Sequence, residues 1–182
     1  MKSSLFFSLL LVVSLSALAQ KPVPSAEQVL KQAYGQAAKE NKNVMVIFHA
    51  SWCGWCHRMD TSLNDPSIKN SFDDNYVITH LTVLESKDKK DLENPGAEAL
   101  LHKHKGKDEG IPFWLVFNGK GELLADALIP PPANTPAAKP KNSGCPATEE
   151  EVEHFIQVLR KTSRMNETQL AAVRKRFREN EK

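Results

Sequence analysis

The run NVMVIF, residues 43–48, has the length of a β-strand and shows no alternation of polar and apolar positions. A strand of that kind is buried on both faces, as in a sheet that helices cover on each side. Further strands are predicted from YVITHLTVLE (residues 76–85) and from GIPFWLVFNGKGELLADALI (110–129). The second of these segments predicts a β-hairpin about the turn NGKG. Because helical segments alternate with these strands, the chain is expected to adopt an α/β fold.

Capping patterns mark where several helices begin. Ser25 with Gln28 forms a capping box before a helix, and Thr148 with Glu151 forms another. Asn166 is expected to open a last, basic helix, whose charged face we interpret as solvated. Shorter helices are predicted after two further caps, namely Asp65 followed by Pro66 and Asn94 followed by Pro95. The segment 129–147 carries six prolines and is expected to form an irregular loop.

The N-terminus has the pattern of a secretory signal peptide. Lys2 precedes an apolar run from Leu5 to Ala19, which ends in the small-residue triplet Ala17-Leu18-Ala19. The alternative is an uncleaved membrane anchor, although the run is shorter than the roughly 20 residues that a spanning helix needs. We therefore expect cleavage near Ala19, a periplasmic or secreted protein, and no stable membrane insertion.

Charge and length limit the classes of function. The 182 residues carry 24 basic and 22 acidic side chains, a net charge of +2. That balance argues against nucleic acid as the main partner, because nucleic-acid binding usually requires a strongly basic face. The length suits one domain. No segment dedicated to association is evident, and a monomer is expected.

Two cysteines, Cys53 and Cys56, follow directly on the first predicted strand in the segment HASWCGWCHRMD. As metal ligands they would need a second pair; His49 and His57 are the nearest candidates, but no second pair has the usual spacing. As a structural disulfide they would close a very small loop, which constrains the unfolded chain little. The third interpretation is a redox couple.

The position of the pair favours the redox interpretation. Cys53 would lie at the N-terminal end of a helix, where free N–H groups and the helix dipole stabilise a thiolate. Cys56 would follow one turn later and resolve the mixed disulfide that Cys53 forms with a substrate. Disulfides also persist outside the cytosol, where the signal peptide would direct the chain.

The order of strand, Trp-Cys-x-x-Cys, helix and later Gly-Ile-Pro before a hairpin resembles the thioredoxin family, from about residue 25 to residue 161. Residues 59–72 look like exported members, including C-terminal domains of the DsbD type. The resemblance implies a thioredoxin fold, with a central mixed sheet of about four strands, flanking helices and an extra C-terminal helix. It also implies a cis bond at Pro112 beside the cysteines, with Ile111 offering backbone groups to a substrate. The alternative for Pro112 is an ordinary trans proline at the start of an edge strand.

The sequence departs from the family at two places. Where cytosolic thioredoxins carry a buried aspartate, this chain has Ile47, so another group or water must take the proton of Cys56. His49 and His57 are candidate proton relays, and the alternative for His49 is a packed histidine at the end of a strand. The residues between the cysteines are Gly54 and Trp55 rather than Gly-Pro, so a reduction potential does not carry over.

The remaining candidates lie around the pair. We expect Trp52, Gly54 and Trp55 to contact substrate together with Ile111 and Pro112, and we expect Trp55 to be exposed. Cys145 is left over, because three cysteines cannot all pair within one chain. We interpret it as a solvent-exposed thiol, and the alternative is a third redox thiol that the Pro-rich loop brings within reach of Cys53.

These observations predict an exported thiol–disulfide oxidoreductase, more a reductase than an oxidase, with Cys53 and Cys56 as its catalytic residues. It would need no metal or organic cofactor, and its partners would be protein thiols or disulfides and a redox partner protein. The alternatives are a peptide-binding module without turnover and a Cys/His metal carrier. The expected organisation is a signal peptide at 1–19, a short lead at 20–24, a thioredoxin-like domain at 25–165 and the basic helix at 166–182.

Overall fold

The computed structural model describes residues 22–135 and 138–181. The predicted signal peptide and the beginning of the lead lie outside these residues. In chain order the elements are α1 (Ala26–Glu40), β1 (Asn43–His49), α2 (Gly54–Leu63), α3 (Lys69–Asp73), β2 (Tyr76–Thr82), the 3-10 helix η1 (Lys87–Leu92), α4 (Ala97–Lys103), β3 (Phe113–Phe117), β4 (Leu123–Asp126), β5 (Leu128–Ile129), β6 (Lys141–Asn142), α5 (Glu149–Thr162), α6 (Glu167–Arg178) and the 3-10 helix η2 (Glu179–Glu181).

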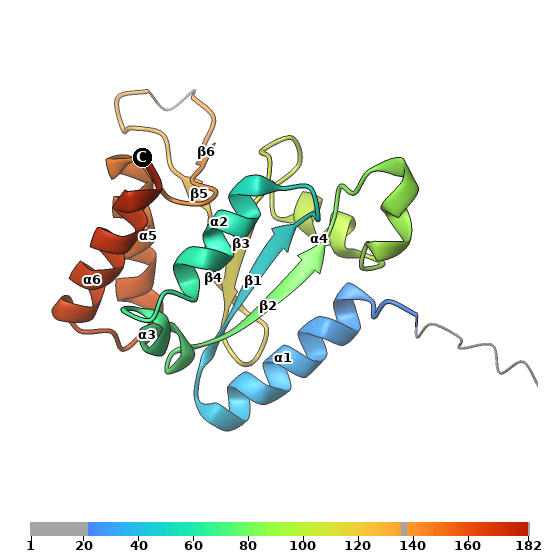
Figure 1. The fold of residues 1–182 in the computed structure, drawn as a ribbon, viewed down its shortest axis with the longest axis horizontal. Coiled ribbons are helices and arrows are strands. Elements are labelled where there is room, and N and C mark those ends of the chain that lie inside the picture. Colours follow the sequence, from blue (N-terminus) through green and yellow to red (C-terminus); the bar gives the residue numbers. More distant parts are fainter. Residues whose placement is uncertain (1–21, 136–137, 182) are drawn as a thin grey trace, which may run out of the picture.

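A mixed four-stranded sheet forms the centre of the molecule, in the order β2-β1-β3-β4 (Figure 1). β1 runs parallel to β2 and antiparallel to β3, and β3 forms the predicted hairpin with β4. The inner five residues of β1 are all buried, as the apolar run predicts. The predicted fold class, with its four strands and flanking helices, is confirmed.

Aromatic side chains from β3 join the sheet to helices on both of its faces. Phe117 packs edge-on against Tyr34 of α1 and against His104, which follows α4. Trp114 points to the other face and packs against Phe155 of α5. Phe155 in turn contacts Phe72 of α3 and Phe177 of α6. The alternation along β3 thus places α1 and α4 on one face and α3, α5 and α6 on the other.

Three helix starts are confirmed and two differ. Capping boxes are present at Ser25, Thr148 and Asn166. The expected starts at Asp65 and Asn94 are wrong in position, because the helices begin later, at Lys69 and Ala97, and neither side chain caps them. Asp65 accepts from Ser67. Asn94 instead accepts from the N–H of Thr82 and donates to Pro24, which ties the end of β2 to the N-terminal segment.

The segment after the hairpin is more ordered than the prolines predict. β4 ends at Asp126, and the next residues form β5, which pairs with β6 at the far end of the Pro-rich stretch. Figure 1 shows this loop, closed at its base by β5 and β6, beside the C-terminal end of the chain. The pairing brings residues 142–147 close to the start of β3.

The basic C-terminal helix is only partly solvated, which corrects the expectation. Leu170, Val173 and Phe177 of α6 are buried in the common core. Arg176 pairs with Asp65, and only 15% of its side chain is exposed. These three apolar residues are spaced three and four positions apart among charged side chains, which places them on one face of the helix, and this face is buried. Among the described residues, no helix combines the length and apolar character needed to cross a membrane.

Candidate active site

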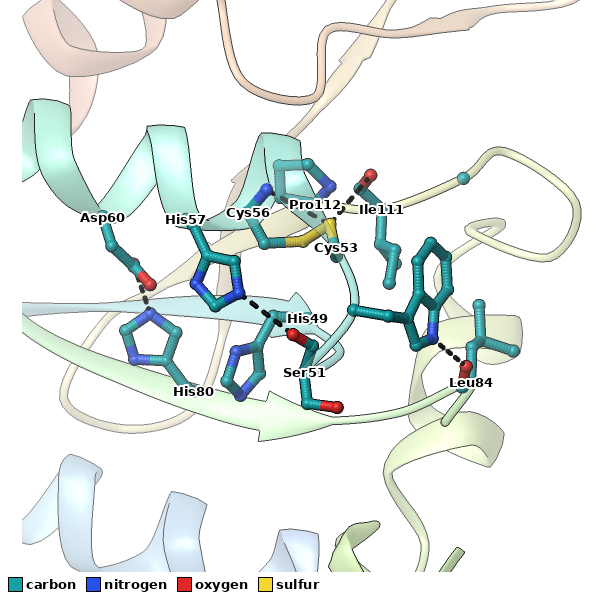
Figure 2. The surroundings of a disulfide bond; sticks show 12 residues. His49, Ser51, Cys53, Cys56, His57, Asp60, His80, Leu84, Ile111 and Pro112 are labelled. Carbon is teal, nitrogen blue, oxygen red and sulfur yellow. Dashed lines mark hydrogen bonds and ion pairs between the residues drawn. A yellow bond between two sulfur atoms is a disulfide. The ribbon is translucent and has the colours of Figure 1, made fainter. Parts of the chain in front are cut away.

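Cys53 and Cys56 form a disulfide at the point where β1 passes into α2 (Figure 2). Cys53 is the N-cap residue of α2, and its sulfur accepts a hydrogen bond from the N–H of Cys56 at 3.1 Å. Both residues are buried, with 3% of Cys53 and 1% of Cys56 exposed. The helix N-terminus thus directs the N–H of Cys56 at the Cys53 sulfur, which is a geometry that stabilises a thiolate there.

The Ile111–Pro112 peptide bond is cis, as the family resemblance implies. The sulfur of Cys53 lies 3.6 Å from the main-chain oxygen of Ile111, and Ile111 packs on the disulfide (Figure 2). This approach follows from the sheet, because β3 runs antiparallel to β1 and Phe113 is the partner of Phe48. The start of β3 therefore meets the end of β1 beside the cysteines.

The two tryptophans are largely exposed next to the disulfide. Trp52 is 60% exposed, and its indole N–H donates to the main-chain oxygen of Leu84 at 2.8 Å. Trp55 is 50% exposed, as expected, and the guanidinium of Arg58 lies 4.7 Å from the centre of its ring. Gly54 has open space where a side chain would begin. The substrate contacts assigned to these residues stay predictions.

The histidines lie near the pair without reaching it. His49 is half-buried, its Nε2 lies 3.2 Å from the hydroxyl of Thr82, and its ring packs against His80. Burial, and then the neighbouring His80, lower the pKa of His49. The Nε2 of His57 lies 3.0 Å from the main-chain oxygen of Ser51 (Figure 2). In the described part of the chain, neither imidazole hydrogen-bonds to a cysteine sulfur, and both proton-relay roles stay predictions.

Sequence reasoning missed Glu85, which holds the turn before the cysteines. Its carboxylate accepts from the N–H of Ser51 at 2.6 Å and from the Ser51 hydroxyl at 2.8 Å. Burial pushes the pKa of Glu85 upward, but the two hydrogen bonds from Ser51 outweigh it, and the pKa lies below its usual value. The sequence carried a usable signal. Ser51 follows β1 and Glu85 follows β2, and residues that follow two parallel, neighbouring strands meet at the same edge of the sheet.

Asn142 was missed as well, and it holds the loop that carries the cis bond. Its side-chain amide donates to the main-chain oxygens of Glu109, Gly110 and Pro112, at 3.1, 3.2 and 3.1 Å. Its side-chain oxygen accepts from the N–H of Gly144 at 2.9 Å. Nothing local in the sequence marks its role at the cis-proline loop, because the residues of that loop lie about thirty positions away.

Cys145 is buried rather than solvent-exposed, which corrects the expectation. Only 6% of the residue is exposed, and burial raises the pKa of its thiol to about 12. The side-chain amide of Asn180 in η2 donates to its sulfur at 3.5 Å. The C-terminal residues therefore cover this thiol, which has the environment of a structural cysteine.

Asn180 also joins the C-terminal segment to the redox helix. Its side-chain oxygen accepts from the hydroxyl of Ser62, and its main-chain oxygen accepts from Arg58 at 2.7 Å. Arg58 is the residue whose guanidinium covers the ring of Trp55. Across the described residues, no group of three or more His, Cys, Asp or Glu side chains is arranged to hold a metal ion.

Comparison with known proteins gives one family match and several low similarities to solved structures. The model of a family described as thioredoxin-like matches residues 25–119, just over half of the chain. Among curated proteins no sequence matches. A disulphide isomerase from Xylella fastidiosa is 19% identical, with 60% of this chain and 78% of that chain covered and a TM-score of 0.47. The oxidised C-terminal domain of DsbD from Neisseria meningitidis is 23% identical, with 57% and 84% covered and a TM-score of 0.40.

A thioredoxin from Thermus thermophilus is 18% identical, with 77% of this chain and 87% of that chain covered and a TM-score of 0.40. These similarities are low, and the assignment rests on the family match and on the site. The matched residues contain both cysteines and the cis proline, in the geometry described above. The chain belongs to the thioredoxin-like family, and its Cys53–Cys56 pair gives it the redox centre of a protein-disulfide oxidoreductase.

Proposed function

We propose that this protein reduces disulfides of protein substrates outside the cytosol. The observation that carries the proposal is the position of Cys53, which caps α2 and lies beside the main chain of Ile111. A thiolate at that position is stabilised by the helix N-terminus and faces backbone that an extended substrate can pair with.

The reaction begins with the dithiol form. The Cys53 thiolate attacks one sulfur of the substrate disulfide, that S–S bond breaks, and the leaving substrate thiolate takes up a proton. Cys56 then loses its proton to His49, His57 or water and attacks the Cys53 sulfur. The second substrate thiol leaves. The Cys53–Cys56 dithiol has supplied the two electrons that reduced the substrate, and it is left as the disulfide, the form that the structure shows.

Substrate binding is assigned to the surface around the disulfide. The N–H of Ile111 makes no hydrogen bond within the described residues, and an extended substrate segment can accept from it. Trp52 and Trp55 supply exposed apolar surface on the same side. A protein partner would then regenerate the Cys53–Cys56 dithiol by thiol–disulfide exchange. In that step the partner supplies the thiols, and the Cys53–Cys56 disulfide is the bond that is reduced.

Two parts of the proposal rest on sequence. Export is supported by Lys2, the apolar run from Leu5 to Ala19 and the triplet at 17–19. The reducing direction is supported by the Ile-Pro pair, which resembles the arrangement in thioredoxins. Oxidases and isomerases use the same scaffold with other potentials, so the direction has to be measured.

The deciding experiment is the reduction potential of the Cys53–Cys56 pair, measured against glutathione mixtures in a Cys145→Ser background that leaves two thiols to count. A value near that of thioredoxin, about −270 mV, is expected, whereas a value near that of DsbA, about −120 mV, would overturn the reducing direction.

Two variants test the roles of the cysteines. Cys53→Ser is expected to abolish exchange with substrates, and Cys56→Ser to trap mixed disulfides. A binding module without turnover would keep its biological activity in Cys53→Ser. A metal carrier would be purified with stoichiometric zinc or copper(I), which either substitution would release.

A further inference from the structure

The guanidinium of Arg58 lies over the ring of Trp55, which stands between the two redox cysteines. Its central carbon is 4.7 Å from the centre of the ring. Trp55 and Arg58 are three positions apart on α2, and side chains at that spacing are neighbours on a helix. Because helical side chains lean towards the N-terminus, the guanidinium is carried back towards the first turn of α2, where Cys53 and Cys56 form the disulfide.

The charge of Arg58 is not neutralised by a carboxylate. Among the described residues no carboxylate lies within ion-pair distance of this guanidinium, which donates instead to the main-chain oxygen of Asn180 at 2.7 Å. The carboxylates near the redox helix have other partners. Glu85 accepts hydrogen bonds from the turn before the cysteines, and Asp60 pairs with His80 at 2.8 Å. A positive charge is therefore held beside the first turn of α2.

The field of Arg58 reaches the buried surroundings of the disulfide. Cys145 and Trp55 line the same pocket beside the cis proline. Burial raises the pKa of the Cys145 thiol, and among the neighbouring charges Arg58 opposes that rise most strongly. A thiolate that forms on this side of the molecule is thus stabilised by the arginine.

Asn180 holds this arginine, and its own side chain is firmly anchored. Only 5% of Asn180 is exposed. Its side-chain oxygen accepts from the hydroxyl of Ser62 at 3.1 Å and from Arg176 at 3.3 Å. Its amide donates to the main-chain oxygen of Pro146 at 3.1 Å. Because both polar atoms of the side chain are in use, the main-chain oxygen of Asn180 is fixed where Arg58 meets it.

Asn180 lies outside the part of the chain that matches the family. The match ends at residue 119, whereas Asn180 belongs to η2, near the C-terminal end. The contact between η2 and the redox helix is therefore a feature of this chain rather than of the matched core.

A positive charge at this place acts differently on the two redox states. The Cys53–Cys56 disulfide is neutral, whereas the dithiol form can carry a thiolate on Cys53. A nearby cation stabilises the thiolate and leaves the energy of the neutral disulfide almost unchanged. It therefore favours the reduced form, which makes the reduction potential of the pair less negative.

We propose that Asn180 is a positioning residue for the redox centre: it holds the charge of Arg58 beside the Cys53–Cys56 pair and thereby makes the reduction potential of that pair less negative. The inference rests on the proposed function and adds to it a determinant of the potential outside the cysteine motif. Asn180 acts through Arg58, so its effect has to vanish when the arginine is absent.

The test equilibrates the purified protein with glutathione mixtures at neutral pH and low salt. In this equilibrium the protein dithiol is oxidised to the disulfide, and one glutathione disulfide is reduced to two thiols. Arg58→Gln is expected to increase the equilibrium constant of this oxidation about threefold, the size of effect that one exposed charge gives. For two electrons, a threefold change makes the potential about 14 mV more negative.

A double-mutant cycle connects Asn180 to the arginine. Asn180→Ala keeps the charge of Arg58 but removes the anchors of the main-chain oxygen, so the equilibrium constant is expected to increase as in Arg58→Gln. In a protein that already carries Arg58→Gln, Asn180→Ala is expected to change nothing further. Ser62→Ala removes one anchor alone, and a smaller change of the same sign is expected there even if Asn180→Ala impairs folding.

The matched control is Arg164→Gln, which removes one positive charge far from the disulfide. Arg164 also donates to main-chain oxygens, those of Asn41 and Asp74, and these residues precede the strands whose other ends lie beside the cysteines. The equilibrium constant is expected to stay at the wild-type value in this variant.

Two further readouts separate an effect of charge from one of structure. The ultraviolet absorbance of the Cys53 thiolate, followed against pH, is expected to show an ionisation constant about threefold smaller in Arg58→Gln than in the wild type. In about 1 M salt, where the Debye length is about 3 Å, the difference between the two proteins is expected to shrink.

The outcomes separate this inference from the proposed function. An unchanged equilibrium constant in Arg58→Gln, a difference that high salt leaves intact, or an Asn180→Ala effect that persists without the arginine would overturn the inference while thiol–disulfide exchange stands. A wild-type potential near that of DsbA would overturn the reducing direction alone, because the inference depends on differences between variants. No exchange of the wild type with glutathione would overturn both.

Discussion

The side-chain amide of Asn142 donates a hydrogen bond to the main-chain oxygen of Pro112, at 3.1 Å. The same amide reaches the oxygens of residues 109 and 110, so one side chain from β6 fixes the loop that contacts the disulfide. The arrangement joins a segment outside the family match to the most characteristic loop inside it.

Asn142→Ala is therefore expected to loosen the cis-proline loop. Three main-chain oxygens and the N–H of Gly144 would lose their partner, and a buried unpaired group costs about 1–3 kcal/mol. Denaturant unfolding should show a loss of that size, and exchange with peptide disulfides should slow. Asn70→Ala on α3 is the control, expected to unfold like the wild type. Unchanged stability and exchange in Asn142→Ala would contradict the assignment.

Local patterns predicted most of the fold. The apolar run of β1, the hairpin turn and the capping boxes at Ser25 and Thr148 each depend on residues close together in the chain, and all are confirmed. The prediction of a cis bond at Pro112 came from the family resemblance, since spacing alone does not distinguish a cis proline from an ordinary trans proline.

The two errors about burial have a common physical cause. Cys145 was expected in solvent because it was left over from the cysteine pair, and Arg176 because it belongs to a basic run of the last helix. Both are covered by partners far away in the chain: Asn180 on Cys145 and Asp65 on Arg176. A side chain whose burial depends on tertiary contacts leaves no local periodicity to detect, and the same holds for Asn142.

The burial of Cys145 predicts low reactivity. With the pKa of its thiol raised to about 12, roughly one thiol in ten thousand is ionised at pH 8. The oxidised native protein is expected to resist iodoacetamide at that pH, and one thiol per chain should react once denaturant is added. Mass spectrometry after short labelling measures both states. Rapid labelling of the native protein would show instead that this thiol opens to solvent.

Glu85 is expected to stabilise the redox turn at neutral pH. Glu85→Gln replaces a carboxylate that accepts two hydrogen bonds from Ser51, and hydrogen bonds to charged groups are worth about 1.5–3 kcal/mol each. A loss of about that size in the free energy of unfolding is expected at pH 7. The exposed Glu98→Gln is the control, with an expected change within about 0.5 kcal/mol.

The difference in the free energy of unfolding between wild type and Glu85→Gln should also depend on pH. Because the pKa of Glu85 is lower in the folded protein than in the unfolded chain, its contribution is present above the unfolded value of about 4.3. The contribution is lost as pH falls through the folded pKa. Wild type and Glu85→Gln should therefore converge in acid, and a constant difference down to the acid transition would count against a buried, ionised carboxylate.

The lowered pKa of His49 predicts a second loss of stability as pH decreases, over a higher pH range than that of Glu85. Burial, and then His80, lower the pKa of His49 in the folded protein, so the unfolded chain binds the proton more readily. The free energy of unfolding is then expected to fall as pH decreases through the unfolded value of about 6.5 towards the folded pKa. In His49→Phe, which keeps a ring beside His80, that decrease should be smaller. Urea unfolding at pH 8 and at successive steps down to pH 5 measures it. At pH 8, where His49 is neutral in both states, the offset between the two proteins reports packing and the lost hydrogen bond with Thr82. Parallel curves from there down to pH 5 would show that His49 does not resist protonation in the fold.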